Sequence, residues 1–272
     1  MKKLLVTLCA LGFVTLSASA WNAADRVSTV GKTLLEKNGL PTTITFKVVE
    51  GVADNSEATT TNIINISKED LTYAGNDSEV AAVVSNEIGH IINGQTSKSK
   101  MRELAKQAIT SKLSADNLIT TAANSEYVIN KTNLNDEKAA DITGVDLMSK
   151  TGYNPLAMVV LITKRPTAST FETLQGKPNN SERAMSTFDY LTYAHPAKVK
   201  AGYGCQEYRN FLAYANPIIE DRNSNAKKLA KFNKEQAKAQ AKRAKDIAQY
   251  KSTGISGWDT SYQLLKSFTE TK

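Results

Sequence analysis

Cysteine, histidine and long apolar runs are all scarce in this chain of 272 residues. After residue 20 it keeps one cysteine, Cys205, so this part of the chain cannot form an internal disulfide bond. No segment there reaches the roughly 18 apolar residues needed to cross a membrane. The longest apolar stretch, Leu156 to Ile162, is far too short. These absences exclude a disulfide-stapled fold and a membrane-embedded one.

The first twenty residues have the pattern of an export signal. Two lysines precede an apolar segment from Leu4 to Leu16, and the small residues 18–20 fit signal-peptidase cleavage before Trp21. We therefore expect residues 1–20 to be a signal peptide. The mature chain is expected to be soluble, either in the periplasm or outside the cell.

Positive charge is concentrated near the C-terminus. Between residues 225 and 251, nine lysines and arginines stand against only Glu235 and Asp246. Alanines recur there at helical spacing, which predicts a long helix with little burial. The segment is typical of a solvated helix, and the alternative is weak contact with anionic membrane or envelope polymer. It lacks the aromatic interleaving that binds single-stranded nucleic acid, so no nucleic-acid partner is expected.

A helix is predicted for residues 77–94. Its apolar positions recur at helical spacing, at Val80, Val84, Ile88 and Ile91. Asn76 or Asp77 can cap its start, and Gly94 is a plausible stop.

Within this helix, residues 86–90 read Asn-Glu-Ile-Gly-His, one substitution away from the zinc signature H-E-x-x-H. In that signature two imidazoles one turn apart share a zinc ion, and the intervening Glu polarises the bound water. Here Asn86 and His90 project from one face, with Glu87 beside them. Because a neutral amide is a poor zinc donor, the sequence leaves open whether a metal binds.

A second motif offers carboxylate ligands. Glu137 and Asp141 are i and i+4 neighbours on another predicted helix, so one can reach a metal while the other orients a ligand. Ala140 and Gly144 leave room for a close approach of the helix that carries His90.

Together these pieces resemble the gluzincin metallopeptidases, which include CAAX prenyl endopeptidases, bacterial heat-shock membrane proteases and periplasmic outer-membrane quality-control proteases. The resemblance runs from about residue 44 to about residue 200. It rests on four motifs in the family's order: residues 79–90, Glu137 to Asp141, Gly152-Tyr153-Asn154-Pro155 and His195-Pro196.

The resemblance implies roles for particular residues. His90 and Glu137 would hold one zinc ion per chain, and Asn86 stands at the degenerate first-ligand position. Glu87 would be the general base, and Asp141 would support a ligand from behind. His195 would be a further catalytic residue near the substrate side of the cleft.

The chain departs from the family pattern at three places. Asn86 replaces the first ligand, Gln95 stands where many relatives carry another histidine, and no arginine follows His195-Pro196. One hypothesis is that His195 moves toward the metal and completes a zinc ligand set of two histidines and one glutamate with His90 and Glu137.

Two functions therefore stay open. The first is an exported zinc metalloendopeptidase that hydrolyses peptide bonds with Glu87 as general base. The second is a catalytically impaired pseudopeptidase that binds extended polypeptide in the same cleft. In both, the partner is a polypeptide, either as substrate or as client.

The predicted fold is α+β and mostly α. Residues 21–38 are expected to form a helix, and residues 43–50 and 61–67 alternate like short strands. The resemblance implies a zincin-like domain over residues 21–205, whose small sheet flanks the active-site helix and holds extended substrate by backbone pairing. A helical, basic extension over residues 206–272 would follow.

Overall fold

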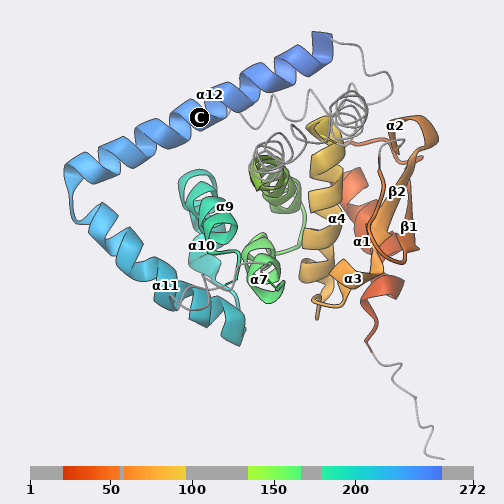
Figure 1. The fold of residues 1–272 in the computed structure, drawn as a ribbon, viewed down its shortest axis with the longest axis horizontal. Coiled ribbons are helices and arrows are strands. Elements are labelled where there is room, and N and C mark those ends of the chain that lie inside the picture. The colour runs from red at the N-terminus through yellow and green to blue at the C-terminus, as the bar shows by residue number, and fades with distance from the viewer. Residues whose placement is uncertain (1–20, 56–57, 96–133, 167–178, 253–272) are drawn as a thin grey trace, which may run out of the picture.

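Helices dominate the computed structural model, which describes residues 21–55, 58–95, 134–166 and 179–252 (Figure 1). The prediction of a mostly helical α+β fold is confirmed. The expected signal peptide and the last twenty residues of the basic extension lie outside the described residues. Within the described residues, no helix is long and apolar enough to span a bilayer.

The N-terminal part pairs one helix with a small sheet. Helix α1 (Ala23–Asn38) ends where Gly39 takes a left-handed conformation with φ of 65°, which glycine adopts without strain. Strands β1 (Thr45–Val49) and β2 (Ile63–Ser67) pair in parallel, with Thr45 opposite Ile63. The short helix α2 (Ala58–Thr61) precedes β2, and α3 (Lys68–Leu71) follows it directly.

Helix α4 (Asp77–Ile92) is the central element, as the apolar stripe predicted. The Asn76 side chain caps its start by accepting hydrogen bonds from the backbone of Ser78 and Glu79. Figure 1 shows α4 between α1 and the sheet on one side and α7 (Leu156–Lys164) on the other. Most of its residues are buried, so the packing around α4 fixes the positions of its side chains.

A helix over residues 134–149 packs against α4 at backbone contact. A Cβ atom placed on Gly89 would lie 2.6 Å from the carbonyl oxygen of Ala140, and one on Gly144 would lie 3.0 Å from the Ser85 hydroxyl oxygen. Two helices can approach this closely only where side chains are missing. This contact brings the two sequence motifs together.

The C-terminal half is a series of helices that pack on α7 and on each other. They are α9 (Ser181–Ala194), α10 (Pro196–Ala201), α11 (Gln206–Asn223) and α12 (Ala226–Ser252). Tyr208, Phe211 and Ala215 of α11 join the same hydrophobic core as α4 and α7. In contrast, α12 is mostly exposed and runs along one side of the molecule (Figure 1).

Candidate active site at the degenerate zinc motif

The residues of the zinc-like motif line a cavity of about 510 Å³. Asn86, Glu87 and His90 reach it from α4, and Glu137 reaches it from the helix over residues 134–149. Residues of α3 and of the segment before α2 also line it.

His90 and Glu137 meet directly in this cavity. The His90 Nε2 atom lies 3.2 Å from the Glu137 Oε1 atom. Two ligands of one tetrahedral zinc ion lie roughly 3.3 Å apart, so this pair has ligand-like spacing. Burial acts to lower the pKa of His90, but the hydrogen bond and charge of Glu137 outweigh it and raise that pKa. A raised pKa favours the protonated imidazolium.

Arg183, from α9, lies between the two carboxylates of the second motif. Its Nη2 atom is 2.8 Å from Glu137 Oε2, and its Nε atom is 2.5 Å from Asp141 Oδ2. Burial acts to raise the pKa of Glu137, but the charge of Arg183 and the contact with His90 hold it at about 2. Glu137 is therefore an anion that already pairs with Arg183 and with His90.

Asn86 is held from behind by Asp141. Its Nδ2 atom donates a hydrogen bond to Asp141 Oδ1 at 2.9 Å, and both side chains are buried. With one N–H used in this way, Asn86 has its other N–H and its amide oxygen left, and an amide oxygen is a poor zinc donor.

Glu87 accepts a hydrogen bond from Asn55. The Asn55 Nδ2 atom lies 2.9 Å from Glu87 Oε2, and burial raises the pKa of Glu87. The same Asn55 amide bonds both the backbone N–H and the backbone carbonyl of Asn65 in β2, at 2.7 and 3.0 Å. Asn55 thus covers the edge of β2 that faces away from β1.

His195 lies in a different cluster. Its Nε2 atom is 2.8 Å from Asp146 Oδ1, and Tyr190 and Arg243 bond the same carboxylate. His195 is not among the residues that line the cavity. The structure brings Asn86, Glu87, His90, Glu137 and Asp141 together and places His195 apart from them.

The donor set does not fit a resident catalytic zinc ion. Catalytic zinc sites use three protein ligands, and among the residues described at this cavity His90 and Glu137 are the pair that meets at ligand-like spacing. The third position offers only the amide of Asn86, and the guanidinium of Arg183 adds a repelling positive charge. Among the residues that the structure describes, no three His, Cys, Asp or Glu side chains are grouped to hold a metal ion.

Comparison with known proteins identifies the ancestry of this site. The model of the family described as Peptidase family M48 matches residues 22–200. The chain belongs to peptidase family M48. The predicted relationship to zinc metallopeptidases is confirmed at the level of the M48 family, whose members depend on zinc. No curated protein and no solved structure gives a significant match.

Sequence reasoning about this M48 member did not find Asn55 or Arg183. Asn55 stands in an ordinary loop composition, and Arg183 lies on a helix far along the chain from both motifs. Neither carries a local signal, because their partners are 32 and 42 residues away.

Proposed function

We propose that this M48 protein binds extended polypeptide in the cavity and does not hydrolyse it as a zinc enzyme. One observation carries the proposal: His90 and Glu137 are paired with each other, and Glu137 is also paired with Arg183, at a site whose first ligand position is the amide of Asn86.

Charge balance supports the loss of the metal. In the family's zinc chemistry a divalent cation neutralises the ligand carboxylate and raises the reactivity of water. Here the guanidinium of Arg183 provides positive charge beside the carboxylates of Glu137 and Asp141, and His90 contacts Glu137. A zinc ion bound by Glu137 would lie close to the guanidinium of Arg183, which repels a second positive charge.

The edge of β2 supports polypeptide as the ligand. The Asn55 amide bonds the N–H and the carbonyl of Asn65 in the way that a peptide group of an added strand would. This edge therefore has the backbone donor and acceptor that an extended chain needs. A client that displaces Asn55 would lie beside Glu87 and along the cavity.

The competing function is the zinc metalloendopeptidase that the resemblance implies, with Glu87 as general base. The 3.2 Å separation of His90 and Glu137 favours it, because this spacing suits a shared ion. The two functions make opposite predictions about zinc content and hydrolysis.

The deciding experiment measures bound zinc and casein-type proteolysis in wild type, Asn86→His and Asn86→His with Glu87→Gln. We expect the wild type to have neither zinc nor activity. Asn86→His should gain about one zinc ion per chain and proteolysis, because Asp141 is placed to orient the new imidazole. The double variant should keep the zinc and lose the proteolysis.

Hydrolysis by the wild type that Glu87→Gln abolishes would overturn the proposal and establish the peptidase. His195→Ala tests separately whether His195 serves as a third zinc ligand. Since His195 is bonded to Asp146, this variant should have the same zinc content as wild type. A loss of bound zinc in His195→Ala would show that His195 reaches the metal after all.

Client binding is tested with a fluorescently labelled unfolded polypeptide. Asn55→Ala uncovers the β2 edge, so it should bind several-fold more tightly than wild type. Asn233→Ala, an exposed position on α12, is the matched control and should leave the affinity unchanged. No binding by either wild type or Asn55→Ala would contradict the proposed function.

A further inference from the structure

Six lysines form a straight row on the outer face of α12. They are Lys227, Lys231, Lys234, Lys238, Lys242 and Lys245, and all six are exposed. Successive members are three or four residues apart, so on an α-helix they fall within an arc of about 80° and extend over about 27 Å. We call this row the lysine stripe.

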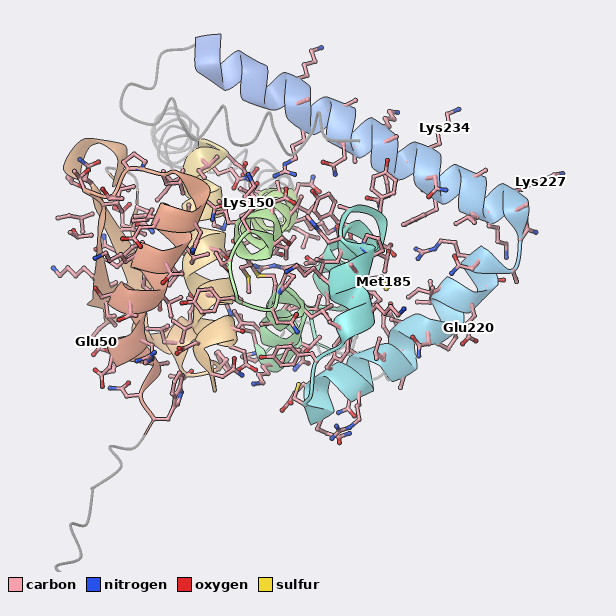
Figure 2. All side chains as sticks on the ribbon, turned by 180° about the vertical axis from the view of Figure 1, so that it is seen from behind. Glu50, Lys150, Met185, Glu220, Lys227 and Lys234 are labelled. Carbon is pink, nitrogen blue, oxygen red and sulfur yellow. The ribbon has the colours of Figure 1, made fainter. Side chains whose placement is uncertain are left out.

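The opposite face of α12 is fixed to the protein body. The Phe232 ring contacts Tyr193 of α9 edge-on, and the guanidinium of Arg222 lies 3.7 Å from its centre. Eleven residues further along, Arg243 Nη1 bonds Asp146 Oδ2 at 2.6 Å. Two anchors three turns apart prevent the helix from rotating, so the lysine stripe must face outward. Figure 2 shows Lys227 and Lys234 extending away from the body.

Most of the charge on the lysine stripe is not neutralised within the protein. Lys231 forms a long ion pair with Glu235, at 3.8 Å. Lys227, Lys234, Lys238 and Lys245 have no carboxylate partner in the described part of the chain. Opposite charges one turn apart stabilise an exposed helix and like charges destabilise it, whereas this row repeats one sign.

We propose that the lysine stripe docks the protein onto an anionic lipid bilayer. A straight row of charges on a rigid helix can meet a flat surface along its whole length. The row contains no apolar or aromatic residue, so α12 would lie on the headgroups without inserting. Lysine suits this role, because it acts as a point charge and does not need the paired geometry of arginine. Each lysine near such a surface strengthens binding several-fold.

A nucleic acid fits these observations less well. Single strands are held in grooves with aromatic side chains on which bases stack, and the lysine stripe is convex and has none. This proposal is independent of the polypeptide-binding function, because the lysine stripe does not include any residue of the cavity.

The test is co-sedimentation of the full chain with phosphatidylcholine vesicles that do or do not contain phosphatidylserine. The stripe variant carries Lys234→Gln, Lys238→Gln and Lys245→Gln. The control variant carries Lys37→Gln, Lys47→Gln and Lys200→Gln, three exposed lysines on other elements, so both variants lose the same charge. All proteins share residues 1–20, so any binding by that segment is common to them. Circular dichroism checks that the helix content is unchanged.

We expect phosphatidylserine to strengthen wild-type binding and added salt to weaken it. The stripe variant should bind the anionic vesicles about a hundred-fold more weakly, whereas the control variant should bind like wild type. Equal affinities of the stripe and control variants would overturn the proposal. A larger loss on duplex DNA than on vesicles would also overturn it, because the natural polyanion would then be a nucleic acid.

Discussion

The side-chain amide of Asn86 donates a hydrogen bond to Asp141 at 2.9 Å beneath the cavity. A histidine at this position would donate to the same carboxylate through one ring nitrogen and present the other to a metal. Asparagine therefore keeps the internal hydrogen bond and loses the strong metal donor. This explains how the surrounding fold can persist while the donor set is incomplete.

Removing this hydrogen bond should destabilise the protein. Asn86→Ala leaves the buried Asp141 with Arg183 but without its amide donor. We expect the free energy of unfolding to fall by about 1–3 kcal/mol, as measured by urea denaturation. Asn233→Ala, which is exposed on α12, should change it little. Equal effects of the two substitutions would mean that the Asn86–Asp141 bond contributes nothing.

The close contact of α4 with the helix over residues 134–149 should not tolerate a methyl group. In Gly89→Ala the new Cβ would lie 2.6 Å from the backbone oxygen of Ala140, so one helix must move. We expect a loss of about 1–3 kcal/mol in stability and a weaker His90–Glu137 contact. Thermal melts check the first, with Gly152→Ala as control, since a Cβ there meets nothing within 4 Å. A neutral Gly89→Ala would show that the helices are further apart.

Stability should depend on acid pH through Glu137. Its pKa in the folded protein is about 2, below the ordinary value of 4.5, because the charge of Arg183 and the contact with His90 outweigh the effect of burial. A depressed pKa means that Glu137 stabilises the fold fully above about pH 4.5 and loses this contribution as the pH falls toward 2. Denaturation midpoints of wild type and Glu137→Gln should therefore converge on acidification. A constant difference would be inconsistent with the low pKa.

The buried cluster at Asp146 should hold α12 in place. Arg243→Met removes the guanidinium from a carboxylate that is 1% exposed and leaves Tyr190 and His195 as its partners. We expect this variant to lose roughly 3–5 kcal/mol. Adding Asp146→Asn removes the unpaired charge, so the double variant should be more stable than Arg243→Met alone. The opposite order would show that the ion pair is not what attaches the helix.

Local patterns were sufficient for the elements near the N-terminus. The helix over residues 21–38, the strands within residues 43–50 and 61–67 and the cap at Asn76 all depend on a few neighbouring residues. The structure has a helix at Ala23–Asn38, strands at Thr45–Val49 and Ile63–Ser67 and the Asn76 cap, but it places residue 61 in α2. The pairing of His90 with Glu137 could also be predicted from the sequence. Both motifs have helical spacing, and small residues such as Ala140 and Gly144 leave room for the two helices to approach each other.

The amino-acid sequence by itself determined the helix that carries residues 86–90, the two short strands, the family and the loss of a strong ligand at Asn86. Only the tertiary structure decided that Arg183 lies between Glu137 and Asp141, that Asn55 covers the β2 edge, and that His195 is bonded to Asp146. The reason is physical. Capping and periodicity depend on neighbouring residues, whereas buried charges take partners that packing brings together from distant parts of the chain.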